Sequence, residues 1–155
     1  MADINVTKGD KAKELFEKGY NCAQAVFGAF AEDLGIDFNF AVKLSSGFGG
    51  GMGRLREVCG AVSGMFLVLN MKYGYDDPKA NEEKKALYKD IQALAEDFKK
   101  ENGSIVCREL LGLSIKGADS PTPEARTEKY YKKRPCSELC KYAGDLVEEF
   151  IKNHP

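Results

Sequence analysis

Residues 45–70, SSGFGGGMGRLREVCGAVSGMFLVLN, constrain the fold of this chain more than any other stretch. They hold five glycines between Gly47 and Gly53, followed by Cys59 at the start of a long apolar segment. Glycine loses more backbone freedom on folding than any other residue, so a cluster this dense is kept where φ must be positive or where no Cβ fits. The small residues after Cys59 predict a helix that another backbone can approach closely. The sequence therefore predicts that a glycine loop delivers a thiol into the centre of the domain.

Apolar residues recur at helical spacing along most of the chain, and no strand-like alternation persists. The predicted helices cover residues 7–18, 22–34, 37–44, 55–72, 78–100, 105–111 and 136–152, with a weaker helix over 124–133. Residues 112–123 contain glycine, serine and two prolines, and are expected to form an ordered loop or lid. Since no linker divides the 155 residues, we predict one all-α domain over residues 1–155, a compact packing of six or seven helices.

Charge and hydropathy restrict the classes of partner. The chain has 23 basic and 24 acidic residues, a formal net charge of −1. Without a basic surplus we expect no nucleic-acid partner and no anionic membrane partner. No apolar run approaches the roughly 18 residues that span a bilayer. The N-terminal end is polar and has no apolar signal core, which predicts a cytoplasmic protein; a homo-oligomer is compatible with the sequence.

Cysteine usage is the strongest chemical signal. The cysteines are Cys22, Cys59, Cys107, Cys136 and Cys140. In a cytoplasmic protein such cysteines are expected to be free thiols, metal ligands or a redox pair rather than structural disulfides. The only histidine is His154, one residue from the end of the sequence. Catalysis by a Cys-His pair and histidine-ligated zinc are therefore not expected.

Three of these cysteines fall in the first turn of a predicted helix, namely Cys22, Cys107 and Cys136. Unpaired backbone N–H groups and the helix dipole favour an anion there, so the thiol pKa is expected to fall from about 8.5 toward 7 or below. Cys59 shares this position if the central helix begins later than residue 55. The alternative interpretation is that cysteine serves as a small apolar filler of the core. That interpretation is favoured for Cys140, which lies in mid-helix one turn after Cys136, although Cys140 is also placed to act as a resolving partner.

The surroundings of the cysteines match a known pattern. Cys22 lies in the segment YNCAQA, Cys59 begins CGAVSG, and Cys107 lies in GSIVCRELL. With Cys136 as the fourth position, the chain resembles the bacterial and archaeal family of small redox-active proteins named C_GCAxxG_C_C, and CGAVSG matches its C-G-A-x-x-G motif. The resemblance covers nearly the whole chain and leaves Cys140 outside the pattern. It implies redox activity or a prosthetic group such as an iron–sulfur cluster, and no substrate.

Two thiol chemistries are open for the candidate residues Cys22, Cys59, Cys107 and Cys136. In dithiol/disulfide exchange with a redox partner protein or a small molecule, Cys59 is expected to be one member, with Cys22 or Cys107 as the other. Alternatively, the same four cysteines are catalytic thiolates and metal ligands for an iron–sulfur cluster or zinc. The candidate cofactor-binding residues, whose backbone N–H groups can donate to sulfur, are Gly49, Gly50, Gly51 and Gly60.

A third hypothesis belongs to another class of protein. In a helical binding or subunit module the cysteines are core filler, and the glycine loop before a helix binds a small anion or a partner. The loop Gly47–Arg54 lacks the Gly-Lys-Ser/Thr of a P-loop and follows no strand, so it is a weak nucleotide signal.

Overall fold

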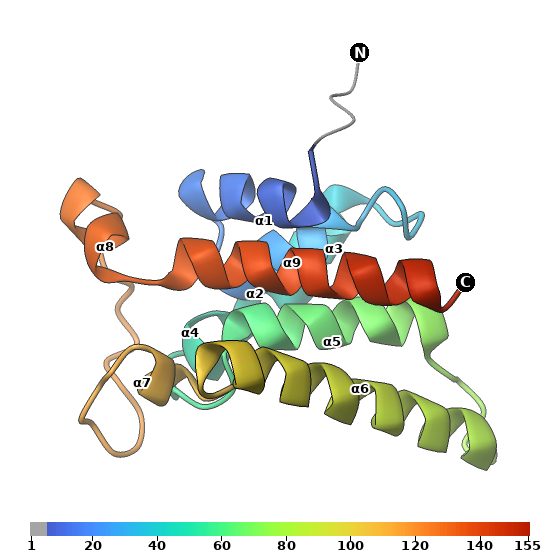
Figure 1. The fold of residues 1–155 in the computed structure, drawn as a ribbon. Helices are drawn as coiled ribbons and strands as arrows, with labels where there is room; N and C mark the ends of the chain where they lie inside the picture. The colour runs from blue at the N-terminus through green and yellow to red at the C-terminus, as the bar shows by residue number, and fades with distance from the viewer. Residues whose placement is uncertain (1–5) are drawn as a thin grey trace.

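The computed structural model describes residues 6–155, and in this range the chain is all-helical, as predicted (Figure 1). Seven helices in the described range have six or more residues: α1 (Lys8–Glu17), α2 (Cys22–Ala29), α3 (Phe38–Ser45), α5 (Gly60–Tyr73), α6 (Asn81–Asn102), α8 (Glu128–Lys133) and α9 (Cys136–Asn153). The shorter ones are η1 (Ser46–Phe48), α4 (Gly49–Met52) and α7 (Cys107–Leu110). Residues 1–5 of the polar N-terminal segment lie outside the described residues. Within residues 6–155, no helix combines the length and apolarity needed to cross a membrane.

Each of the first three helices follows a polar residue whose side chain caps it, namely Thr7, Asn21 and Asp37. The Thr7 hydroxyl accepts a hydrogen bond from the Asp10 backbone N–H at 3.0 Å, and Asn21 accepts one from that of Gln24 at 2.9 Å. In both cases the later side chain accepts from the cap backbone in return, which completes a capping box. These caps fix where α1 and α2 start, and therefore make Cys22 the first residue of α2.

The central helix α5 begins at Gly60, five residues later than predicted. Its predicted start was wrong because the backbone before it is left-handed: Met52, Arg54 and Arg56 have φ of 69°, 64° and 60°. Right-handed helix cannot form through such residues. Cys59 is therefore the residue that directly precedes α5.

Other predicted boundaries were also too generous. The helix predicted over 22–34 ends at Ala29, and hydrogen-bonded turns lead from there to Gly35, whose φ is 69°. The helix predicted from residue 78 begins at Asn81, because the Asp77 carboxylate and carbonyl hold a turn by accepting from the Lys79 and Ala80 backbone N–H groups. The segment 105–111 is helical only over α7, and the segment 124–133 only over α8.

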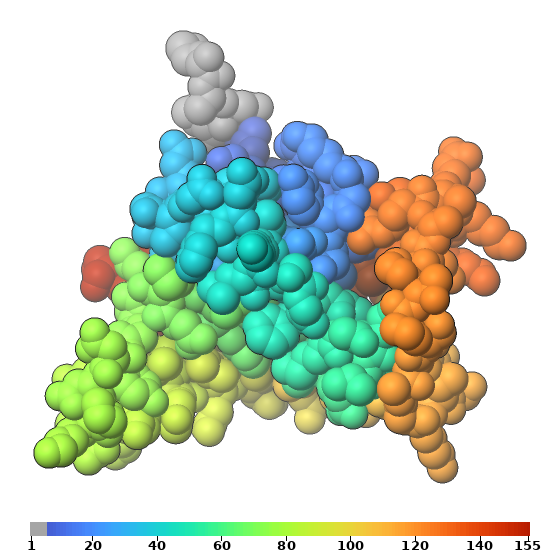
Figure 2. All heavy atoms as spheres, turned by 180° about the vertical axis from the view of Figure 1, so that it is seen from behind, coloured from blue at the N-terminus to red at the C-terminus, as the bar shows by residue number. Residues whose placement is uncertain are grey.

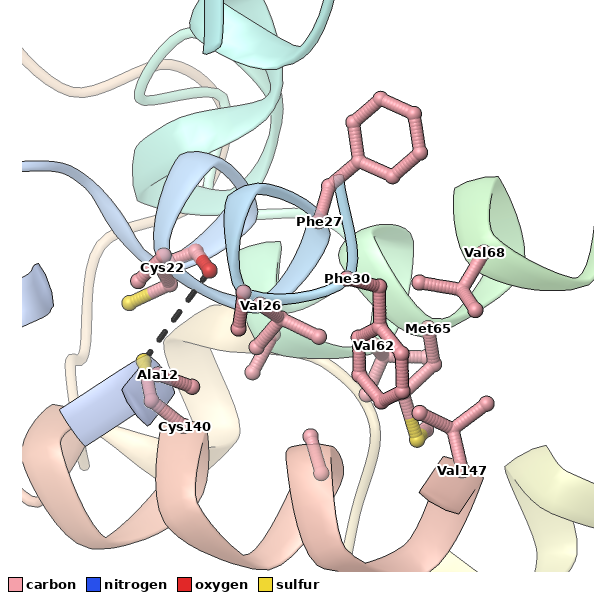
Figure 3. Packing of buried hydrophobic residues seen from close by; sticks show 14 of the residues in the cluster. Ala12, Cys22, Val26, Phe27, Phe30, Val62, Met65, Val68, Cys140 and Val147 are labelled. Carbon is pink, nitrogen blue, oxygen red and sulfur yellow. Dashed lines mark hydrogen bonds between the residues drawn. The ribbon is translucent and has the colours of Figure 1, made fainter. Parts of the chain in front are cut away.

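The motif C-G-A-x-x-G sets the contact between α5 and α2. Gly60 and Gly64 lie one turn apart on the face of α5 that meets α2. A Cβ at Gly64 would lie 2.8 Å from Cβ of Val26, and one at Gly60 would lie 3.0 Å from Cβ of Cys22. These glycines therefore let the two helices touch, as the small residues predicted. Figure 3 shows the result: Val26 of α2 packs with Val62 and Met65 of α5 in one apolar core.

One end of the molecule gathers the segments that carry the chemistry. In Figure 1 the starts of α5 and α9 lie at the same end as α4, α7 and the loop that follows α7. Figure 2 shows that loop and α8, in orange, standing along this end beside the segment before α5. The two are joined by the Asp119 backbone N–H, which donates to the Arg54 carbonyl at 2.9 Å.

Candidate functional site

A cavity of about 320 Å³ at this end is lined by four of the five cysteines. Each occupies the start of a different helix: Cys22 of α2, Cys107 of α7 and Cys136 of α9 are first residues, and Cys59 directly precedes α5. All four are buried and none forms a disulfide. The predicted helix-start positions are thus confirmed, and the four segments meet at one cavity.

The glycine loop forms one wall of the cavity through a left-handed turn. Gly50, Gly51 and Gly53 have φ of 67°, 70° and 65°, which glycine adopts without strain. A Cβ at Gly51 would lie 2.5 Å from Cβ of Cys107 and 2.8 Å from Cα of Arg56. The loop backbone therefore approaches Cys107 more closely than any other residue type would allow. The predicted cofactor-binding glycines, Gly49, Gly50, Gly51 and Gly60, all line the cavity.

A short antiparallel pairing fixes Cys59 relative to Cys107. Val58 and Val106 form an isolated bridge, flanked by a hydrogen bond of 2.8 Å from the Cys59 backbone N–H to the Ile105 carbonyl. Side chains alternate between faces in such a pairing, so Cys59 and Cys107 point to the face opposite Val58 and Val106. The pairing therefore holds Cys59 and Cys107 at fixed positions on the same side of the two paired segments.

Four arginines surround the thiols. Arg56 is 4% exposed, and its Nη1 lies 3.6 Å from Sγ of Cys107. The Asp119 carboxylate accepts from Nε and Nη2 of Arg56 at 3.1 and 3.0 Å, and from Nη2 of Arg54 at 3.1 Å. Asp119 therefore holds two guanidinium groups at the wall of the cavity, and one of them touches a sulfur.

The other two arginines are Arg126 and Arg134, which lie in the part of the chain between α7 and α9. Arg126 donates to the Phe16 and Tyr20 carbonyls at 3.0 and 3.1 Å, and its guanidinium lies 4.3 Å from the centre of the Phe16 ring. Arg134 pairs with Glu124 at 3.3 Å. Arg134 lies two residues before Cys136 in the sequence, whereas Arg126, Asp119 and Glu124 have no sequence signal. No motif marks those residues in a polar loop, so only the tertiary fold identifies them.

The thiols are held protonated, which corrects the expectation of lowered pKa values. Burial raises the pKa of Cys59 to about 12, although the Val62 and Ala61 backbone N–H groups oppose the shift. Burial also raises the pKa of Cys107, against the lowering effect of Arg56. Contact with Cys22, together with burial, raises the pKa of Cys136. The free energy needed to remove a thiolate from water exceeds the stabilisation that the helix dipole and the free N–H groups of a helix start provide.

Cys22 lies at the centre of a three-cysteine contact. Cys136 lowers its pKa, but Cys140 and burial outweigh that effect, and the pKa of Cys22 is raised well above its ordinary value. Sγ of Cys140, which is fully buried, lies 4.0 Å from the Cys22 carbonyl oxygen, as Figure 3 shows. Cys140 faces the apolar core and does not line the cavity.

A metal centre needs a tighter grouping than this conformation provides. Among residues 6–155, no three Cys, His, Asp or Glu side chains are placed so that they could hold a metal ion. The chain therefore has the four thiols that an iron–sulfur or zinc site needs, but in this conformation they are not placed close enough together to bind the metal. The four-thiolate centre on Cys22, Cys59, Cys107 and Cys136 stays a prediction.

An all-helical domain with four thiols from four segments at one cavity defines a cysteine-cluster protein. A family model described as "Putative redox-active protein (C_GCAxxG_C_C)" matches residues 20–150. The chain belongs to this family, as its motifs predict. No curated protein and no solved structure matches it.

Proposed function

We propose that this chain is a thiol-based redox protein in which cavity cysteines interconvert between the dithiol and the disulfide state. The observation that supports this most is the convergence of Cys22, Cys59, Cys107 and Cys136 on one cavity. Cysteines used only as apolar filler would have no reason to gather from four helix starts around one opening.

Cys22 and Cys136 are the pair that we expect to form the disulfide. Both line the cavity, and the two thiols are near enough for each to alter the pKa of the other. Cys59, the member expected from the sequence, is held by its backbone hydrogen bond to Ile105. We therefore place Cys59 beside the reacting pair rather than within it.

Cys107 is the thiol on which we expect the reaction with an external disulfide to begin. A nucleophilic cysteine must be a thiolate when it attacks, and a neighbouring guanidinium favours that form. Arg56 contacts Cys107 and no other cysteine sulfur. A mixed disulfide formed on Cys107 would be attacked by Cys136, and Cys22 would then attack Sγ of Cys136. At each exchange one S–S bond forms as another breaks, and the leaving sulfur takes up the proton that the attacking thiol releases.

The proposal is tested by counting free thiols in protein purified and kept without oxygen, before and after mild oxidation by an external disulfide. We expect a loss of two thiols per chain that dithiothreitol reverses, with peptide mapping linking Cys22 to Cys136. Cys136→Ser should limit the loss to the one thiol of Cys107, held as a mixed disulfide with the oxidant, because no Cys136 is left to resolve it. Cys140→Ser is the matched control on the same helix, and should retain the full loss. Unchanged thiol counts in the wild-type protein would overturn the proposal and favour the binding-module hypothesis.

Metal analysis of the same anaerobic protein distinguishes the competing thiol chemistry. A four-thiolate site would hold about one metal ion or cluster per chain and would release it when thiols are lost. Protein with less than about 0.2 metal per chain, against this full occupancy, supports the dithiol proposal. About one metal or cluster per chain would instead favour the thiolate-ligated centre and overturn it.

A further inference from the structure

The cavity lined by the thiols has an excess of positive charge, whereas the whole chain does not. Its wall includes four guanidinium groups and the single carboxylate of Glu124. Asp119 adds a second carboxylate through its pairs with Arg54 and Arg56. Positive charges therefore exceed negative ones around the cavity, although the chain has a formal net charge of −1. The fold concentrates positive charge at this one opening.

Arg126 contributes one of the two unbalanced positive charges, since Asp119 is shared by Arg54 and Arg56 and Glu124 pairs with Arg134. Within residues 6–155 Arg126 has no carboxylate at ion-pair distance, because its partners are the Phe16 and Tyr20 carbonyls and the Tyr131 hydroxyl. Its guanidinium also lies 5.1 Å from the centre of the Tyr130 ring. Backbone and aromatic contacts thus hold Arg126 firmly in place without neutralising it.

The resident thiols do not account for this charge. Among the described residues, Arg56 is the only one of these four arginines with a hydrogen bond to a sulfur, so the thiols do not provide partners for the other three. Guanidinium groups bind carboxylates, sulfonates and phosphates through paired hydrogen bonds. An anion that comes from outside is therefore the natural partner of this wall.

We propose that the substrate exchanged at these thiols is a small anionic disulfide, whose carboxylate or sulfonate is held by Arg126 and Arg134 while its sulfur reaches Cys107. This inference rests on the thiol-exchange function proposed above and names its substrate class. A cavity of about 320 Å³ lies at the small end of ligand sites, which run from about 300 to 1,000 Å³. It suits one half of a small disulfide, with the other half leaving through the opening.

The reaction balances without a further reactant. Sγ of Cys107 attacks one sulfur of the substrate, the substrate S–S bond breaks, and the first half leaves as a thiol. A second protein cysteine then displaces the other half, which also leaves as a thiol. Two protein thiols are oxidised to one disulfide, and one substrate disulfide is reduced to two thiols that take up the two protons.

A charge series of similar aliphatic disulfides tests the inference. Anionic dithiodipropionate, neutral hydroxyethyl disulfide and cationic cystamine are compared by the rate of thiol loss in reduced wild-type protein. We expect dithiodipropionate to react fastest and cystamine slowest, with steps of about tenfold at low salt, the low end of electrostatic focusing in clefts. Salt should compress the series, since it screens the attraction.

Variants of one ion pair separate the effect from damage to the fold. Arg134→Gln should slow dithiodipropionate and speed cystamine. Glu124→Gln removes the carboxylate that neutralises Arg134, so it should do the opposite. Lys132→Gln makes the same change of charge as Arg134→Gln on the exposed side of α8 and should change neither rate. We expect Glu124→Gln to react faster with dithiodipropionate than the wild-type protein does. Damage to the fold would not produce this increase.

The outcomes distinguish the two proposals. If all three disulfides react at equal rates, or Lys132→Gln acts as strongly as Arg134→Gln, the anionic substrate is wrong and thiol exchange stands. If none of the three disulfides removes thiols reversibly, the exchange function itself fails.

Discussion

Nη1 of Arg56 lies 3.6 Å from Sγ of Cys107, inside a wall where the guanidinium is only 4% exposed. This contact gives Cys107 a feature that the other cysteines lack, a buried cation directly on the sulfur. The backbone at the same residue is left-handed, with φ of 60° at Arg56. Non-glycine residues in this conformation are strained and are found mainly at functional sites.

Replacing Arg56 should make Cys107 less reactive. In Arg56→Gln the pKa of Cys107 should rise further, because burial would no longer be opposed by the guanidinium. We expect alkylation of Cys107 at pH 8 to slow about tenfold or more, the effect of removing an opposite charge at this range. Mass spectrometry of iodoacetamide-treated protein measures it. Arg54→Gln is the control, since Arg54 shares Asp119 but touches no sulfur. Equal slowing in both variants would contradict a direct role for Arg56.

Asp119 should act on Cys107 in the opposite direction. It neutralises Arg56 through two hydrogen bonds of 3.1 and 3.0 Å. Asp119→Asn would leave the Arg56 charge less balanced, so the pKa of Cys107 should fall and its alkylation should accelerate severalfold. The same change removes an ionic partner from a buried cation, so the midpoint of urea unfolding should also fall. Asp33→Asn, which breaks a pair with Lys8 on a 57% exposed side chain, should change neither quantity. Slower alkylation in Asp119→Asn would show that Asp119 only positions Arg56.

The elements of the fold were predictable from local signals, whereas the walls of the cavity were not. Thr7, Asn21 and Asp37 indicate helix starts, because each side chain caps its helix by accepting a hydrogen bond from a backbone N–H only three residues later. The meeting of Cys59 with Cys107 depends on a bridge between residues distant in sequence, for which neither segment carries strand-like alternation. The predicted direction of the cysteine pKa shifts was wrong for the same reason. Burial raises these pKa values, and burial is set by tertiary packing. Arg126 reaches Phe16 across the fold, which no local pattern encodes.

Stability should fall as the solution becomes alkaline. Burial raises the pKa of Cys59 to about 12, whereas an unfolded cysteine has a pKa of about 8.5. Between these values the unfolded chain loses a proton that the folded chain keeps, so the free energy of unfolding falls by up to about 1.4 kcal/mol per pH unit for this thiol. Below about pH 7, where the unfolded thiol also keeps its proton, Cys59 should contribute almost no pH dependence. Urea unfolding from pH 7 to 10, kept reduced, measures the slope. Cys59→Ala should have a shallower slope, and an unchanged one would mean that Cys59 titrates normally.

Two neighbouring glycines separate backbone strain from crowding against Cys107. Gly51 and Gly53 have similar φ, 70° and 65°, so alanine at either position incurs the cost of a left-handed residue, about 1–2 kcal/mol. Around Gly53 the nearest atom to a new Cβ is the Gly47 carbonyl oxygen at 3.7 Å, which is an ordinary contact. At Gly51 the new Cβ would lie 2.5 Å from Cβ of Cys107 and 2.8 Å from backbone of Arg56. Neither neighbour can move without displacing the cavity wall, so overpacking should add about 1–3 kcal/mol.

We therefore expect Gly53→Ala to unfold at slightly lower urea and to keep wild-type thiol reactivity. Gly51→Ala should lose more stability, and Cys107 should react at an altered rate even in the fraction that remains folded. Comparing the two variants by urea unfolding and by alkylation of Cys107 cancels the shared left-handed cost. If both lose the same stability and react alike, the close approach of the glycine loop to Cys107 is wrong. The dense glycines would then serve the turn alone, and the cavity wall would owe its shape to other segments.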